Sequence, residues 1–573
     1  MQNLFRKKTI STILAENKLA ESGSNKLEKT LGLRDLTAMG IAAIIGAGIF
    51  STIGNASFNG GPAVVILFAF TAIACGFSAM CYAEFASVIP ISGSAYTYAY
   101  AAFGELIAWI IGWALIVEYA IGNIVVAISW SDYFTSLMAG LGWHIPACFS
   151  MDYLSAKRGY EESMQFLSAG KTLNASLSEA FTAWNTAPSF LGIRVILDLP
   201  AVSIVLAITA LIYRGLKETR NASNFMVAIK LLVVIMVIVV GAFYVDPANW
   251  SPFAPNGMKG VMMGVSSVFF AYIGFDALAT TAEECKDPRK DLPKSMMASL
   301  LICTVLYIAI ALVLTGMVSY THLGVGDPLS FAFEMLHLKW ISGIIAVSAV
   351  VAMASVLLVF QNGQPRIWMS MSRDGLLPKL FSSIHPKYKT PWFATIITGI
   401  LVAVPALFMN LKEVTDLSSI GTLFAFVLVN AGVIKMESHK SNYHTGFKVP
   451  YFNGKFIVPA LYVTGWIIVF VVAPQAVKNF LRFADFWQQL PMLAFILVVT
   501  LMAILSYRNN YSIIPVLGLC SNFYLMTELG ITNWIGFFIW LCFGLLIYFI
   551  YSQKNSRLSK INKSTLPTEH LAI

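Results

Sequence analysis

Two glycines interrupt the first long apolar run of the chain, and this interruption is a candidate for half of a binding site. The run covers roughly residues 36 to 57, and Gly46-Ala47-Gly48 lies near its middle. Each glycine lowers helix stability by about 1 kcal/mol relative to alanine, and inside a bilayer every backbone N–H and C=O group needs a partner. A helix broken at this depth is tolerated where the freed groups face a cavity or a ligand. Close helix packing would also explain glycines here.

A second interruption lies in the sixth apolar run, where Ile273-Gly274-Phe275 breaks an otherwise apolar sequence. Runs one and six are the first members of two five-helix halves, and five is odd, so the halves enter the membrane from opposite sides. Interrupted helices at matching positions of inverted halves are the best sequence pointer to the binding site of a secondary transporter. Exposed N–H groups at the first break would receive a carboxylate, and exposed carbonyls at the second an ammonium. The two breaks therefore predict a site for an amino acid.

Two ionisable residues lie deep within apolar runs, Glu118 in the third and Lys230 in the fifth. A charge there costs about 3 kcal/mol or more unless it is paired or faces water. Lys230 could reach the inner surface with its long side chain. Otherwise its ammonium would take the place of a bound cation between the first and eighth runs. A desolvated lysine releases its proton more readily than an exposed one, which suits proton coupling.

Glu118 has three interpretations from sequence: it could contact a substrate ammonium, relay a proton, or accept a hydrogen bond within the bundle. Asp276 follows the second break and could cap the helix that resumes there. Met353 and Ser355 in the eighth run could line a side-chain pocket, although apolar packing also accounts for Met353.

Other kinds of chemistry lack the residues they need. The histidines and cysteines show no metal-ligand spacing, and no nucleotide-binding motif is present. A membrane enzyme would need a convergent nucleophile and base or a metal set, and neither is visible. We therefore expect no enzymatic activity, no metal and no cofactor, with a proton as the coupling ion.

Fourteen apolar runs position these residues. The chain has 573 residues, of which 57% are hydrophobic and 12% charged, against about 25% charged residues in a soluble protein. The predicted class is an all-α polytopic membrane protein, with an inverted five-plus-five helix repeat and broken first and sixth helices. The predicted spans are about 36–57, 62–89, 100–131, 198–213, 222–245, 258–282, 295–319, 339–364, 391–409, 414–436, 457–475, 490–507, 512–528 and 532–552.

These spans group into larger predicted segments. They are an N-terminal tail at 1–35, a first half at 36–245, a second half at 258–436, four additional helices at 457–552 and a C-terminal tail at 553–573. The loop at about 140–197 is the one long segment between spans that is not membrane-like. We expect it to form a small cap on the outer face.

The distribution of positive charge gives the orientation. Most lysines and arginines lie in the tails and in the loops on the same side, which is the positive-inside pattern. Both termini are therefore expected in the cytoplasm, in a multi-pass protein of the cell membrane. The net charge of +9 comes from these loops and does not indicate a nucleic-acid partner. The expected partners are an amino acid and the lipid bilayer, and the sequence leaves the oligomeric state open.

Several motifs together carry a family resemblance. They are Leu31–Gly40 running into Ile45–Phe50, Ser92–Tyr96, Phe103–Glu105, Phe270–Asp276, Glu283–Pro288 and Arg373–Pro378. Over about residues 30 to 550 the chain resembles the amino acid–polyamine–organocation superfamily, and within it most closely the cationic amino acid transporter branch.

The resemblance implies alternating access and assigns contacts to individual residues. It implies amide contacts to the substrate carboxylate from Ala47, Gly48 and Ile49. It implies carbonyl contacts to the ammonium from Phe270, Ala271 and Ile273. In proton-coupled relatives a lysine at the place of Lys230 fills the sodium position, and a glutamate at the place of Glu118 lies near the substrate.

The expected function is secondary active transport of amino acids, with proton symport as the expected coupling. An exchanger of the same fold would use the same site. A sensor that binds amino acids without moving them is the alternative from another class, and an ion channel would need a filter motif or a ring of charges that is absent. The sequence does not distinguish cationic from neutral substrates.

Overall fold

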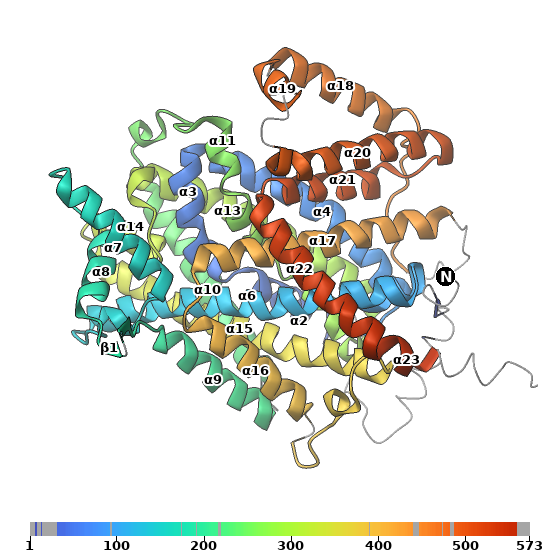
Figure 1. Ribbon diagram of the computed structural model, residues 1–573, viewed down its shortest axis with the longest axis horizontal. Helices are drawn as coiled ribbons and strands as arrows, with labels where there is room; N and C mark the ends of the chain where they lie inside the picture. The colour runs from blue at the N-terminus through green and yellow to red at the C-terminus, as the bar shows by residue number, and fades with distance from the viewer. Residues whose placement is uncertain are drawn as a thin grey trace, which may run out of the picture.

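The chain folds into a bundle of helices, described here from a computed structural model. The residues described are 6–8, 13, 31–91, 94–173, 175–190, 192–215, 219–388, 390–438, 446–472, 474–481 and 486–558. Across these ranges eight helices are long and apolar enough to cross a membrane, and shorter apolar helices accompany them. Two-residue strands β1 (Ser189–Phe190) and β2 (Ile193–Arg194) form the only sheet in the same ranges. The predicted all-α polytopic class is confirmed (Figure 1).

The first broken helix consists of three pieces. Helix α2 (Leu33–Ile44) ends where Ile45 turns to an extended conformation, with ψ at 98°. The chain resumes in the π-helical turn η1 (Gly48–Thr52) and continues as α3 (Ile53–Gly60). The interruption predicted at Gly46 to Gly48 is therefore confirmed.

The second broken helix has the same design. Helices α11 (Gly257–Met262) and α12 (Val265–Tyr272) precede the break, and the 3-10 helix η5 (Phe275–Glu284) follows it. Gly274 has a φ of +124°, a conformation that side chains other than glycine rarely adopt. The predicted second interruption is confirmed, and its glycine is required by the backbone.

The two breaks touch each other. A Cβ atom placed on Gly48 would lie 2.3 Å from the Cα atom of Ala271, and one on Gly274 would lie 2.8 Å from the carbonyl oxygen of Ala43. A Cβ on Gly46 would lie 2.7 Å from a methyl of Val356. The glycines therefore allow close packing at the breaks, and the packing interpretation of them is confirmed.

Three of the remaining helices in the first half pack against their counterparts in the second half. In the first half the remaining helices are α4 (Val64–Val88), α5 (Ser94–Ala102), α6 (Glu105–Gly140), α9 (Leu199–Arg214) and α10 (Thr219–Ala242). In the second half they are α13 (Pro288–Met317), α15 (Lys339–Arg373), α16 (Trp392–Ala406) and α17 (Leu411–Ser438). Helix α4 packs against α13, α6 against α15 and α9 against α16. Two halves related by a two-fold axis would produce this pairing, and the division into domains stays a prediction.

Several helices extend beyond the predicted spans. Helix α6 continues to Gly140, α13 begins at Pro288 and α15 ends at Arg373. Polar residues at these ends remain helical because the backbone bonds of a helix do not depend on an apolar surrounding. Hydropathy marks where a helix lies in hydrocarbon and does not mark where it stops.

The C-terminal helices attach to the core through a polar contact. They are α18 (Ile457–Val472), α19 (Pro474–Leu481), α20 (Phe486–Asn509), α21 (Ile513–Thr527) and α22 (Ile531–Ile547), followed by η8 (Tyr548–Ser552) and α23 (Gln553–Asn555). The side-chain amides of Asn430 on α17 and Asn522 on α21 both donate to the hydroxyl of Ser78 on α4, each at 2.8 Å. Helix α21 is thereby fixed against both halves of the bundle.

A cap covers one end of the bundle. It contains η3 (Ala147–Phe149), α7 (Tyr153–Ser168), α8 (Ala175–Thr186) and the short hairpin. Its own apolar cluster is formed by Cys148, Ala156, Ala183 and Ile196. The cap contacts α17 through an ion pair at 2.9 Å between Arg158 and Glu413. In Figure 1 the cap lies at the left.

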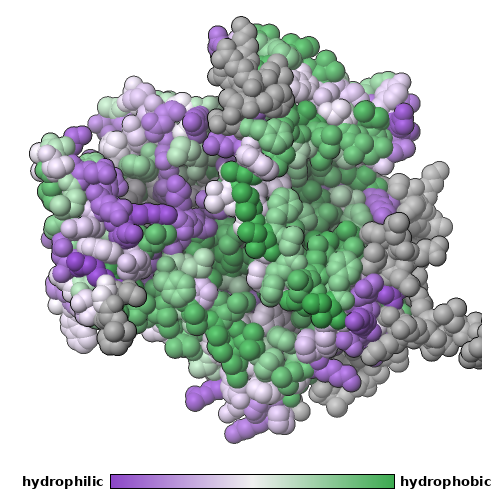
Figure 2. Space-filling view, in the orientation of Figure 1, coloured by the Kyte–Doolittle hydropathy of each residue, from purple (hydrophilic) through white to green (hydrophobic). Residues whose placement is uncertain are grey.

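Both described ends of the chain meet at the other end of the bundle. The ammonium of Lys8 lies 2.6 Å from a carboxylate oxygen of Asp374, and the Ser556 hydroxyl donates to Glu105 at 2.6 Å. Figure 2 shows hydrophobic surface over the middle of the molecule, with hydrophilic residues gathered over the cap. The two ends of the chain therefore lie on one side of an apolar belt.

Several connections between the long helices contain short 3-10 helices. Among them are η2 (Gly61–Ala63), η4 (Pro247–Trp250) and η7 (Lys379–Ser382). Between α13 and α15 the chain forms η6 (Tyr320–His322) and the eight-residue helix α14 (Pro328–Met335), which lies on the cap side against η1 and α3.

The contact between the breaks gives a testable prediction. Gly48→Ala places a methyl group against backbone that cannot rotate away, so we expect a loss of about 1–3 kcal/mol of stability from overpacking. Gly343→Ala is the control, because a Cβ at Gly343 meets nothing within 4 Å. Thermal unfolding of both purified variants measures the difference. Equal unfolding temperatures would contradict the close contact.

Candidate functional site

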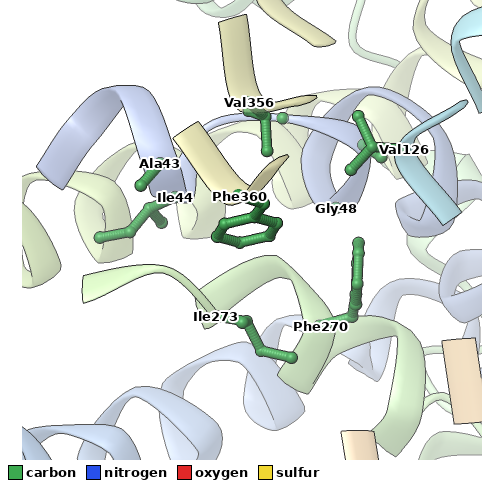
Figure 3. A pocket seen from close by; sticks show the side chains of 10 residues that line it. Ala43, Ile44, Gly48, Val126, Phe270, Ile273, Val356 and Phe360 are labelled. Carbon is green, nitrogen blue, oxygen red and sulfur yellow. The ribbon is translucent and has the colours of Figure 1, made fainter. Parts of the chain in front are cut away.

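A small cavity lies where the two broken helices cross. Figure 3 shows the side chains of Val126, Phe270, Val356 and Phe360 around it. Its wall is formed by Ala43, Ile44, Gly46, Ala47, Gly48, Val126, Phe270, Ile273, Val356 and Phe360. Every one of these residues is apolar or a glycine, so the polar groups offered to a ligand here come from the backbone.

The first break offers amide groups. The carbonyl oxygen of Gly46 accepts the N–H groups of Ile49 and Phe50, both at 3.2 Å. The Ile49 amide is therefore already used. The amides of Ala47 and Gly48 precede the resumed helix, where no turn of helix supplies an acceptor. These two N–H groups form the end of the cavity that suits a carboxylate.

The second break offers carbonyl groups. Because α12 ends at Tyr272, the last carbonyls of that helix receive no helical N–H. The carbonyl of Phe270 accepts the N–H of Ile273 at 3.2 Å, and the side chains of both residues line the cavity. The carbonyl of Phe270 is therefore already used, and Ala271 is absent from the wall of the cavity.

Lys230 lies directly behind the first break and is only 1% exposed. Its ammonium donates to the carbonyls of Ala42 and Ile45, both at 3.1 Å, and to the hydroxyl of Ser355 at 2.9 Å. The Ser355 hydroxyl itself donates to Ala352. Three acceptors match the three N–H donors of a protonated lysine. Lys230 therefore joins α10, α2 and α15 and does not extend to the surface.

Tyr307 also binds the end of α2, and nothing in the sequence predicts this contact. Its hydroxyl donates to the carbonyl of Ile44 at 2.9 Å, one residue before the carbonyl of Ile45 that Lys230 holds. Carbonyl groups at the end of α2 therefore accept hydrogen bonds from two side chains, Lys230 and Tyr307. A tyrosine in an apolar span is ordinary, so only the structure reveals this contact.

Glu118 lies away from the cavity and is 3% exposed. Its Oε2 atom has no hydrogen-bond partner among the described residues. Asp276 accepts the N–H of Gly274 at 3.3 Å, so it caps the resumed segment.

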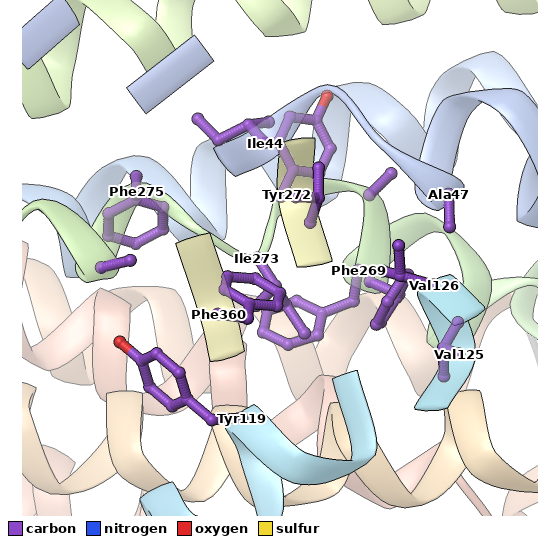
Figure 4. Close-up of a cluster of buried hydrophobic side chains, with 14 of the residues drawn as sticks. Ile44, Ala47, Tyr119, Val125, Val126, Phe269, Tyr272, Ile273, Phe275 and Phe360 are labelled. Carbon is purple, nitrogen blue, oxygen red and sulfur yellow. The ribbon is translucent and has the colours of Figure 1, made fainter. Parts of the chain in front are cut away.

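Phe360 is part of the cavity wall and packs against Tyr119, the residue that follows Glu118. Its ring meets that of Tyr119 edge to face, with centroids 5.5 Å apart. Figure 4 shows Phe360 between Ile273 and Tyr119. In this arrangement Glu118 does not reach the cavity wall.

The remaining predicted residues take other positions. Ser355 binds Lys230 and is absent from the wall of the cavity, and Met353 is fully buried. Val126, Val356 and Phe360 form part of the wall and were not predicted. Nothing in their sequence surroundings separates them from neighbouring apolar residues.

Comparison with known proteins identifies the family. The amino acid permease family model matches residues 31–502, and a model of the family's C-terminal part matches residues 511–556. A methylthioribose transporter of Bacillus subtilis is 38% identical over 98% of this chain and 100% of its own. A branched-chain amino acid permease of the same organism is 37% identical over 97% and 99%. The vacuolar cationic amino acid transporter 4 of Arabidopsis thaliana is 30% identical over 99% and 98%. The chain therefore belongs to the amino acid permease family.

Proposed function

We propose that the protein is a secondary active transporter that moves neutral, apolar amino acids by alternating access. One observation carries the proposal: residues of the first break and residues of the second line the same apolar cavity. A carboxylate and an ammonium on one carbon atom fit these two ends. The side chain of the substrate would then lie against Val126, Val356 and Phe360.

The apolar wall favours a neutral side chain over a charged one. A charged group placed there would lose its hydration without gaining a side-chain partner. The relatives named above differ in substrate, since one is named for branched-chain amino acids, one for cationic amino acids and one for methylthioribose. A thiosugar has neither a carboxylate nor an ammonium, so it would leave both ends of the cavity unused. These considerations support an aliphatic amino acid.

We further propose that transport is coupled to protons through Lys230. The protonated side chain holds the end of α2 through two carbonyls, and a neutral amine has one donor fewer. Loss of the proton would therefore weaken the link between α10, α2 and α15 and release the first broken helix. Exchange of amino acids without net proton movement is the alternative that the same site allows.

The proposed function also includes an orientation of the protein in the membrane. The end of the bundle that holds Lys8 and Ser556 would face the cytoplasm of the cell, and the cap would face outward. The excess of basic residues in the loops on the side of the tails supports this orientation.

Uptake into proteoliposomes tests substrate and coupling together. We expect labelled L-leucine to accumulate when the outside is acidic relative to the inside, and unlabelled L-leucine to compete far better than L-arginine or methylthioribose. Collapse of the gradient with a protonophore should remove accumulation. Counterflow without net uptake would instead establish exchange, and competition by methylthioribose alone would overturn the amino-acid assignment.

Substitution of Lys230 tests the coupling residue. Lys230→Ala leaves the carbonyls of Ala42 and Ile45 without their donor, so we expect binding of L-leucine to persist while pH-dependent uptake falls at least about tenfold, the factor for 1.4 kcal/mol. Lys259→Ala on α11 is the matched control, because Lys259 is exposed. Binding by calorimetry and uptake between pH 5 and 8 measure both effects. Unchanged pH dependence in Lys230→Ala would exclude it from coupling.

A further inference from the structure

A second tyrosine holds the other half of the first broken helix, on the cap side of the cavity. Tyr133 lies on α6, and its hydroxyl donates to the carbonyl of Phe50 in η1 at 2.5 Å. The rings of the two residues meet edge to face, with centroids 6.2 Å apart and an angle of 86°. Both residues are fully buried. This contact plays no part in the substrate site described above.

Helix α14 lies against the element that Tyr133 holds. It packs against η1, which contains Phe50, and against α3. A phenol has one hydrogen-bond donor, and in Tyr133 this donor goes to the carbonyl of Phe50.

The segment around α14 lies tightly on the first broken helix. A Cβ on Gly54 of α3 would lie 2.5 Å from the carbonyl oxygen of Leu323 and 2.9 Å from Pro328. A Cβ on Gly326 would lie 2.5 Å from a carboxylate oxygen of Asp132 on α6. Backbone therefore packs directly on both helices, which leaves little space for a passage from the cap side.

The contact crosses between α6 and the first broken helix. Helix α6 packs mainly against α15 and α17, whereas η1 packs against α12, α3 and α14. Movement of η1 away from α6 would have to break this bond.

We propose that Tyr133 is a positioning residue that holds the cap side of the transporter closed. Its hydroxyl and the carbonyl of Phe50 form the outer latch. The latch keeps η1 against α6, and α14 packs on η1, so opening of the cap side requires this bond to break. The inference rests on the proposed alternating access, and it adds the element that closes one side.

Access to the cavity from the cap side tests the latch directly. Val126→Cys places a thiol in the cavity wall, and a charged methanethiosulfonate reagent is applied to proteoliposomes in which the cap faces outward. In this background we expect Tyr133→Phe to raise the labelling rate about five- to tenfold, the factor that a lost hydrogen bond gives. Tyr98→Phe is the matched control, because the Tyr98 hydroxyl is buried and has no partner among the described residues. Its labelling rate should equal that of the parent.

A second measurement needs no substitution at Tyr133. Hydrogen exchange in the unaltered protein should show the peptide over residues 328–335 protected, and Tyr133→Phe should accelerate its exchange while α13 stays unchanged. If labelling is faster in Tyr133→Phe but the protein transports no amino acid, the proposed function is wrong and the latch is supported. If the protein transports amino acids but Tyr133→Phe changes neither the thiol labelling rate nor the hydrogen exchange over 328–335, only the latch is wrong. If Tyr133→Phe does not fold, rapid exchange over 328–335 in the unaltered protein would still overturn it.

Discussion

The structure depends on one constraint: backbone groups freed inside an apolar bundle must find partners. Two helices are broken at the same depth, and each break leaves donors and acceptors that water cannot reach. The chain satisfies those on the far side of the first break with fixed side chains, namely Lys230 and Tyr307 at the end of α2 and Tyr133 at η1. Under the proposed function, a bound substrate would supply hydrogen-bond partners to the backbone groups at the cavity.

The glycines at the two breaks allow the two broken helices to approach each other closely. Gly48 lets the breaks approach until one backbone touches the other, and Gly274 supplies a backbone angle that other residues avoid. The two breaks are therefore in direct contact with each other. Under the proposed function, this closeness would let one small substrate reach both breaks.

Sequence reasoning located the breaks, the buried lysine and the buried carboxylates because each violates the pattern of a spanning helix. Glycine pairs and charges are rare in such helices, so their positions are informative. The tyrosines and the residues of the cavity wall fit the ordinary pattern of a spanning helix. In the sequence, Val126, Val356, Phe360 and Tyr307 cannot be told from other residues of a buried helix. Their roles arise from contacts between segments far apart in the chain, and only the folded arrangement contains that information. Helix ends were also missed, because α6 and α15 continue as helices outside the apolar belt.

Lys230 has a consequence for the electrical behaviour of the carrier. A diffusible cation would leave with the substrate, but an ammonium attached to the chain stays behind and can release only its proton. Under the proposed mechanism the empty carrier would return with a neutral amine at its centre. The membrane voltage would then act on the loaded half of the cycle and not on the return. The charge moved in each turnover would be limited to one by the single lysine at the break.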